Sequence, residues 1–552
     1  MSLVANRLAR TARIRRASPL TGAAALARHI VRADRRRMLV WAASIAAFTA
    51  YFSVALRTVF DDAALAARAE IMRTPTGIVM GGPGYGLNDY SPDVALANEG
   101  TLWIAAALAV LASSHVVRHT RAAEDDGRAE LVRAQPVGRL APAAAALGTL
   151  AALLAAIAGV GAGVFLATGA TDAASAIAMM LACSASAFVF GAIALVCAQV
   201  ASSARGALGL SLAALAAAVV VRAAGDLQAE GGSALSWLSP IAWAQQIRAF
   251  VDLRWWPIAL APLAAAGLVA LAAALAGRRD LGAGLLPERP GRARAGWGLR
   301  GTAALALRQH RGAIAGTVIG SALVLYASGT MMGSLEEMVA DLVATNAVLG
   351  RLFGTDPNAF RDGFLGILAL YAAGASAALG IAVALRARRE EESGRLELLL
   401  SHPVGRARWF AGEMLVAGAG ALAVLAASLA ALWAGALQAG VVDPPLAAYA
   451  RVALSYGSAA LVFPALAAAL VGVWPRGAGL AWAGLAAAFV LEFFGPVFDV
   501  PEAVAALSPF HGVPEPFANA YDAAGPATLL GVAAALAAAG IVGLRARDLR
   551  SG

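Results

Sequence analysis

The chain has 552 residues, of which 60% are hydrophobic and only 14% are charged, and its mean hydropathy is +0.71. A water-soluble protein of this composition would expose far too much apolar surface, so the sequence predicts an all-α polytopic membrane protein. The 43 basic residues are all arginine, which excludes P-loop nucleotide binding and Schiff-base chemistry by lysine in this chain. The two cysteines, Cys183 and Cys197, form no disulfide or metal pattern.

Residues 1–37 predict a basic tail followed by an amphipathic helix on the cytoplasmic membrane surface. The tail has no apolar core of its own, so it is not a cleavable signal peptide. In residues 20–37, apolar side chains such as Ile30 share one helical face and arginines such as Arg32 share another. This pattern is typical of a helix that lies along a membrane. The first membrane span is expected at 38–56.

Eleven further apolar segments of spanning length follow, so the sequence predicts about twelve transmembrane helices. The segments are expected near 101–117, 143–168, 176–201, 207–221, 257–276, 313–332, 364–385, 411–437, 450–473, 478–498 and 526–544. The outside stretches before the sixth and the twelfth span contain Ser-Pro and aromatic residues, which suit interfacial or re-entrant helices.

The distribution of arginine predicts the orientation of the chain. When alternate loops are assigned to opposite sides with the N-terminus inside, 34 of the 43 arginines fall inside and 9 fall outside. Cytoplasmic loops of membrane proteins carry the excess of basic residues. Both termini are therefore expected in the cytoplasm, and the high net positive charge gives no reason to expect nucleic acid as a partner.

The sequence repeats itself with an offset of about 267 residues. Leu-Ser-Pro occurs at 238–240 and 507–509, and Arg-Asp-Leu occurs at 279–281 and 547–549. We therefore predict two six-span halves, and an even number of spans gives both halves the same orientation. The predicted halves are 38–276 and 313–552, joined by a cytoplasmic linker with a surface helix at 277–312.

Two predicted cytoplasmic loops, 124–139 and 391–406, share one motif. It reads acid, Gly-Arg-x-Glu-Leu and then Pro-Val-Gly-Arg, in the same order and spacing. Each copy predicts acids at a helix N-terminus, a short helix with an apolar face, and a proline that ends the helix. A turn that only sets topology would need arginine alone. The shared order of the other residues therefore favours a docking surface for a soluble partner.

With these two motifs the chain resembles the permeases of the ABC-2 type exporter family, and its fused length is similar to that of actinobacterial exporters of polyketide antibiotics. The resemblance implies that each loop holds a coupling helix, which seats in a separate ATP-binding cassette subunit. The implied coupling residues are Glu124, Asp125, Gly127, Arg128, Glu130, Leu131, Pro136, Arg139, Glu391, Glu392, Gly394, Arg395, Glu397, Leu398, Leu399, Pro403 and Arg406. The first copy is more polar than the second, which predicts that the two halves couple unequally.

The resemblance also implies a function, the ATP-driven export of amphiphilic, antibiotic-like or drug-like compounds across the bacterial cell membrane. Two copies of the partner would bind ATP and Mg²⁺, whereas this chain has no Walker motif, binds no cofactor and is not an enzyme. Membrane lipid is the other expected partner. The alternative is a proton-coupled secondary transporter of the major facilitator type, which also has twelve spans in parallel repeats.

Two observations leave alternatives open. Glu492 is the one acid within a predicted span, and intramembrane carboxylates are costly. It is a candidate for the substrate path, or else a residue at the outer water interface. His115 and His119 have the spacing of metal ligands on a helix, but no third ligand is evident and we predict no metal site.

Overall fold

The computed structural model describes residues 18–58, 60–286, 293–296, 299–333, 357–494, 500–511, 513, 517 and 523–548. Within these residues the chain forms helices and no strand, which confirms the all-α fold class. The chain divides into two compact units, Met1–Pro290 and Gly291–Gly552. The division falls inside the predicted linker, and each unit is described by itself below.

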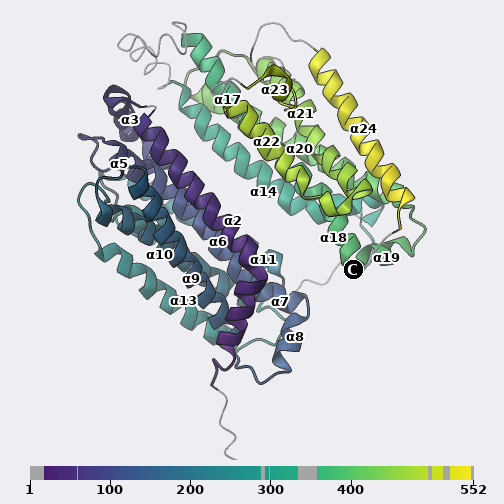
Figure 1. Ribbon diagram of the computed structural model, residues 1–552, viewed down its shortest axis with the longest axis horizontal. Coiled ribbons are helices and arrows are strands. Elements are labelled where there is room, and N and C mark those ends of the chain that lie inside the picture. Colours follow the sequence, from purple (N-terminus) through teal and green to yellow (C-terminus); the bar gives the residue numbers. More distant parts are fainter. Residues whose placement is uncertain are drawn as a thin grey trace, which may run out of the picture. The chain divides into compact units, whose positions relative to one another are not determined.

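The first unit is arranged around helix α10, which packs against α6, α9, α11 and α13 (Figure 1). Its long helices are α2 (Ala23–Thr58), α6 (Thr101–His119), α9 (Ala141–Ala167), α10 (Ala173–Val200), α11 (Ala204–Asp226) and α13 (Leu260–Ala276). Helix α10 is rich in alanine and other small residues, which allow neighbouring helices to approach closely in a membrane.

The second unit repeats this order of helices. Its long helices are α14 (Thr302–Thr330), α17 (Pro357–Ala384), α20 (Arg406–Gln438), α21 (Leu446–Val473), α22 (Leu480–Phe494) and α24 (Ala524–Ala546). Helices α14 and α20 pack most closely at Gly329 and Gly435, where a Cβ atom on Gly435 would lie 2.2 Å from the carbonyl oxygen of Tyr326. Only glycine fits this approach of the two backbones.

Eleven of the described helices are long and apolar enough to cross a membrane, so the chain is a multi-pass membrane protein. The predicted span 478–498 corresponds to α22, which has 15 residues and is shorter than the other eleven. The structure describes this segment only as far as residue 494.

The predicted surface helix and first span form a single element. Helix α2 runs without interruption through residue 37 and has 36 residues, so it is about 54 Å long and exceeds the apolar core of a bilayer. Its N-terminal part is fixed to the bundle because Asp34 is buried and binds His119 of α6. Likewise, α14 joins residues 302–312 of the predicted linker to the seventh span.

Short helices lie between the long ones at the end of the first unit opposite its own repeated loop, 124–139 (Figure 1). Between α2 and α6 they are α3 (Asp62–Arg73), α4 (Pro75–Gly81), α5 (Pro92–Ala95) and a π-helical turn (Leu96–Gly100). Before α13 lies α12 (Pro240–Gln245), which is buried against α6 and α10. In the second unit, the described part of the equivalent stretch contains α23 (Glu502–Ala505).

Candidate functional site

Each copy of the repeated motif folds into two short helices joined by a glycine. The first copy forms α7 (Arg121–Asp125) and α8 (Arg128–Arg133), and the second forms α18 (Arg386–Glu392) and α19 (Arg395–Leu400). Gly127 and Gly394 have φ angles of 73° and 71°, a left-handed conformation that glycine adopts without steric cost. We call α8 and α19 the coupling helices, after the role that the sequence predicts for them.

One acid in each copy binds an arginine inside its own unit. Glu124 accepts two hydrogen bonds of 2.7 Å from the guanidinium of Arg279, and Glu391 accepts two of 2.6 Å from Arg547. These arginines follow the last long helix of each unit, α13 or α24. The prediction that the acids lie at the N-terminus of the coupling helix is therefore wrong for this pair, because the glycine turn separates them from it.

These two ion pairs are bidentate and mostly shielded from solvent. The exposed fraction of the side chain is 10% for Glu124 and 8% for Arg279, and 8% for Glu391 and 20% for Arg547. Two parallel hydrogen bonds between guanidinium and carboxylate give both strength and a fixed orientation. Loss of one partner would leave a buried charge uncompensated. Each coupling helix is therefore fixed to the end of the last long helix of its unit.

Arg121 strengthens this attachment in the first unit, and nothing in the sequence indicated it. Its side chain is fully buried and forms ion pairs of 3.2 Å with both Glu124 and Asp125. It also donates to the carbonyl oxygens of Gly282 (2.6 Å) and Ala283 (2.9 Å), in the segment that follows Arg279. Burial of an arginine requires several acceptors at once, and only the folded loops bring them together.

The last arginine of each motif makes a second connection. Arg139 donates to the carbonyl oxygen of Ala276, and Arg406 donates to that of Arg547 at 3.1 Å. Pro136 and Pro403 lie in the exposed turn after each coupling helix, as predicted for residues that end it. The motif thus joins the coupling helix to the end of α13 or α24 on both of its sides.

The outward faces of the two coupling helices are alike. Leu131 is 74% exposed and Leu398 is 72% exposed, and the neighbouring Glu130 and Glu397 are exposed as well. The additional apolar residues of the second copy face inward, since Leu396 is only 2% exposed. The most exposed apolar residue is thus one leucine in each copy, while half-buried Leu400 stands where the first copy has exposed Arg133. Unequal coupling of the two halves stays a prediction.

The remaining motif residues make contacts within their own loops. Leu399 is half-buried against the core that surrounds Leu396, so Leu398 is the exposed leucine of the pair. Three ion pairs link charged residues of the loops: Arg128 with Asp126 (2.8 Å), Arg395 with Glu390 (2.8 Å) and Arg388 with Glu392 (2.7 Å). Asp125 pairs with Arg121 and also accepts a hydrogen bond of 2.6 Å from the backbone N–H of Ala204.

The two spaced histidines do have a third neighbour, Asp34 of α2. The ligand atoms of Asp34, His115 and His119 lie within 4.8 Å of one another. Asp34 already binds His119 at 2.9 Å and Arg118 at 3.0 Å through the same carboxylate oxygen. A guanidinium on the carboxylate opposes a metal cation there, so the geometry favours a polar network that attaches α2 to α6. A buried pair, His310 and Glu413 at 3.2 Å, attaches α14 to α20 in the second unit.

Glu492 lies on α22 and contacts the second Leu-Ser-Pro sequence. Its carboxylate accepts a hydrogen bond of 2.7 Å from the hydroxyl of Ser508, and its side chain is half-buried. This contact fixes the segment after α22 to the helix itself. A role for Glu492 in a substrate path stays a prediction.

A buried ion pair that the sequence did not indicate lies at the other end of the first unit. Arg222 and Asp226 of α11 are 3.2 Å apart with side chains no more than 1% exposed. Arg222 donates to the carbonyl oxygens of Ile78 (3.1 Å) and Val79, and Asp226 accepts from Ser236 at 2.6 Å. The predicted fifth span ended at residue 221, which placed both charges outside the bundle. In the structure they join α11 to α4 and to the segment before α12.

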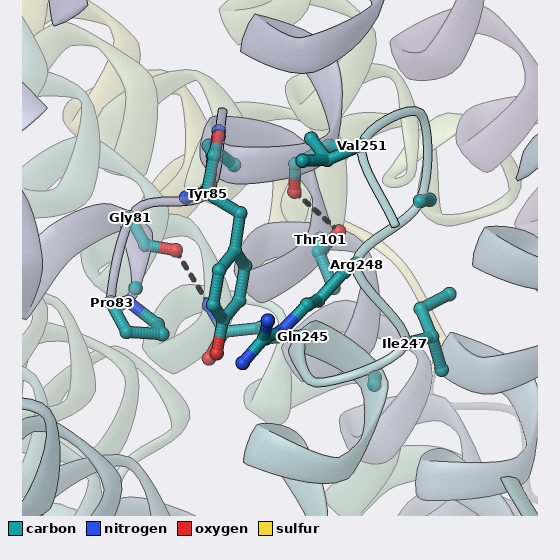
Figure 2. A pocket seen from close by; sticks show the side chains of 13 residues that line it. Gly81, Pro83, Tyr85, Thr101, Gln245, Ile247, Arg248 and Val251 are labelled. Atoms are coloured by element: carbon teal, nitrogen blue, oxygen red, sulfur yellow. Dashed lines mark hydrogen bonds between the residues drawn. The ribbon is translucent and has the colours of Figure 1, made fainter. Parts of the chain in front are cut away.

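A small cavity of about 10 Å³ in the same unit is lined by Gly81, Tyr85, Gln245 and Arg248, among others (Figure 2). Gln245 donates to the carbonyl oxygen of Gly81 at 2.5 Å, and the Arg248 guanidinium lies 4.5 Å from the centre of the Tyr85 ring. Burial raises the pKa of Tyr85 to about 12, so its hydroxyl stays protonated and donates to Gly231. The cavity has room for about one water molecule and none for a drug-sized compound.

The buried ion pair predicts a large effect of one isosteric change. Glu124→Gln removes the charge but keeps the shape, and it leaves Arg279 buried without a carboxylate. We expect the free energy of unfolding to fall by about 3 kcal/mol. Thermal unfolding of the detergent-solubilised protein measures this change.

The matched control is Asp126→Asn, which removes the acid of a neighbouring pair whose side chains are both 60% exposed. Exposed pairs contribute about 0–1 kcal/mol, so this variant should unfold almost like the wild type. Equal effects of the two variants would show that the Glu124–Arg279 pair does not hold the loop.

Comparison with known proteins agrees with this architecture. The family model for the C-terminal domain of the multidrug efflux system permease Rv1217c matches residues 299–545. The multidrug efflux system permease protein Rv1217c of Mycobacterium tuberculosis (strain ATCC 25618 / H37Rv) is 34% identical over 540 residues, which cover 97% of this chain and 96% of that protein. The match extends over both units and both repeated loops. The chain therefore belongs to the ABC-2 type family of multidrug efflux permeases.

Proposed function

We propose that this chain is the membrane-spanning subunit of an ATP-driven exporter, and that one ATP-binding cassette subunit docks on each coupling helix. The observation that carries the proposal is the repeated exposed Glu-Leu face, Glu130-Leu131 on α8 and Glu397-Leu398 on α19. Each face belongs to a helix that buried ion pairs fix to its own unit. Two equal faces support two copies of the partner for each permease chain.

The leucines hold the partner and the charges orient it. Burial of one exposed leucine in an apolar groove stabilises a complex by about 1.5–3 kcal/mol. An ion pair at the rim of the groove adds only about 0–1 kcal/mol. Leu131 and Leu398 therefore supply most of the affinity. Glu130 and Glu397 select the orientation in which the partner binds.

The buried pairs transmit movement of the partner to the membrane helices. A displacement of α8 pulls on Glu124 and Arg279, and hence on the end of α13. A displacement of α19 acts in the same way through Glu391 and Arg547 on α24. Packed helices joined by ion pairs move as rigid bodies rather than deforming continuously. A small displacement of the coupling helix therefore displaces the membrane span to which it is bound.

The proposed cargo is amphiphilic, antibiotic-like or drug-like compounds. The related protein of M. tuberculosis is named a multidrug efflux system permease, which supports this cargo class. ATP and Mg²⁺ bind in the partner subunit, and this chain holds neither and is not itself an enzyme. Membership in the ABC-2 type family argues against the alternative of a proton-coupled transporter of the major facilitator type.

The coupling helices face the cytoplasm in this proposal, because ATP is available there. The split of 34 to 9 arginines supports that orientation, with both termini inside the bacterial cell membrane.

Leucine substitutions test the docking role. We expect Leu131→Asp and Leu398→Asp each to remove about half of the ATP-binding subunit that co-purifies with the tagged permease. Together they should remove nearly all of it, because aspartate cannot enter an apolar groove. Glu397→Arg should leave the partner bound but lower the ATPase stimulation by the permease. Leu286→Asp is the control, since Leu286 is 60% exposed in the first unit and lies outside the coupling helices.

The equal exposure of the two leucines predicts equal losses from the two single variants. Full retention of the partner by the double variant would contradict docking and leave the loops as signals for topology only.

The orientation has its own test in a chain whose two cysteines, Cys183 and Cys197, have been replaced. Ser393 lies in the turn before α19. Ala234 lies in the first unit, at the end opposite its own coupling helix α8. Both residues are exposed, so Ser393→Cys and Ala234→Cys each present an accessible thiol. A membrane-impermeant thiol reagent on intact cells should label Ala234→Cys and not Ser393→Cys. The reverse pattern of labelling would invert the proposed topology.

A further inference from the structure

A cavity of about 530 Å³ lies at the coupling-loop end of the first unit. It is enclosed by the N-terminal part of α2, the end of α6, α7 and α8, the start of α9, part of α10 and the end of α13. The volume is within the range of pockets that bind small ligands. Because the sequence repeats, the residues that line the cavity have counterparts about 267 positions later in the second unit.

Large side chains occupy most of the equivalent place in the second unit, where an open groove lined by Arg406, Arg408 and Arg545 remains beside them. Ala129 and Ala143 line the cavity, and the residues 267 positions later are Leu396 and Phe410, which are 2% and 0% exposed in a buried apolar cluster. Three more small lining residues have larger counterparts in or against the same cluster: Pro142 and Trp409, Ala273 and Ile541, Ala276 and Leu544. The cavity is therefore built into the sequence of the first unit.

The lining combines apolar walls with charged groups of both signs. Of its three acids, Asp34 is paired with Arg118, Glu124 is paired with Arg279, and Asp280 is exposed. Leu26, Ile30 and Leu147 contribute apolar wall, from α2 and α9. Arg133 and Arg139 are exposed at the rim, and neither forms an ion pair with a carboxylate in the described part of the chain. The counterpart of Arg133 is Leu400, which packs against the apolar cluster of the second unit. An exposed basic residue of the first unit thus stands where the second unit has a half-buried apolar one.

We propose that this cavity binds one anionic phospholipid of the inner leaflet. The phosphate lies between Arg133 and Arg139, and an acyl chain lies along Leu26 and Ile30. The guanidiniums of the two arginines attract the negative charge of the phosphate. The apolar walls next to them favour an anion with acyl chains over inorganic phosphate. The assignment to the inner leaflet rests on the proposed function, in which the coupling loops face the cytoplasm.

Native mass spectrometry of the delipidated full-length permease, co-purified with its ATP-binding subunit, tests the proposal. Titration with phosphatidylglycerol should give one tightly bound lipid for each permease, whereas phosphatidylcholine should bind more weakly and inorganic phosphate should not compete at equal concentration. Ala129→Leu/Ala143→Phe copies the second unit and should abolish this tight binding. Arg133→Leu should weaken it about fivefold, the usual contribution of one basic residue near an anionic lipid.

The matched control is Arg205→Leu, which removes an exposed arginine of the first unit that does not line the cavity. It should bind phosphatidylglycerol like the wild type. If the cavity-filling variant does not fold, Arg133→Leu against Arg205→Leu still decides the question. Unchanged affinity in Arg133→Leu, or equal binding of the two lipids by the wild type, would overturn the proposal.

Retention of the ATP-binding subunit is measured in the same spectra and separates the two proposals. A variant that loses the lipid but keeps the partner supports a lipid site apart from docking. A cavity-filling variant that keeps the lipid but loses the partner would make the cavity part of the docking surface, and the lipid site would then be wrong.

Discussion

The structure depends above all on one interaction that occurs twice, a buried bidentate pair between a carboxylate before the coupling helix and an arginine after the last long helix. Glu124 binds Arg279 in the first unit, and Glu391 binds Arg547 in the second. The two partners are more than 150 positions apart in the sequence. Each pair therefore connects the loop after the second long helix of its unit to the end of the last long helix. Each pair thereby fixes the coupling helix to the last long helix of its unit, which is the connection that the proposed transmission of movement requires.

Both units have this ion pair, but they differ in the residues that pack on the inward side of the coupling helix. In the second unit, Trp409 and Phe410 are buried next to Leu396 behind the coupling helix. In the first unit, the equivalent residues are Pro142, Ala143 and Ala129, and the space that they leave is a cavity. The outward faces of both coupling helices nevertheless expose one glutamate and one leucine. The sequence difference between the two motifs therefore affects the interior of each unit more than the exposed glutamate and leucine of its coupling helix.

Much of this architecture could be predicted from the sequence, because spans, arginine bias and repeated motifs are local signals. Both Arg-Asp-Leu sequences were visible as repeats, but nothing in their spacing showed that Arg279 would bind Glu124. The burial of Arg121 and of the Arg222–Asp226 pair also depends on acceptors that distant segments supply. The continuous helix α2 was divided in two because its arginines suggested a surface position, whereas the buried Asp34 fixes it to the bundle. The replacement of Trp409 and Phe410 by Pro142 and Ala143 was visible in the repeat, but only the fold shows that the smaller residues line one cavity.

Site-specific photo-crosslinking in living cells tests the central claim most directly, because it reports which protein touches each coupling helix in the membrane. A photoreactive residue placed at position 131 and, separately, at position 398 should form a covalent product with the ATP-binding subunit. The two positions should give similar yields, since both leucines are exposed to nearly the same extent. A photoreactive residue at position 234, at the opposite end of the first unit, should give no such product. Absence of the product from both coupling helices, with the partner present, would contradict the account.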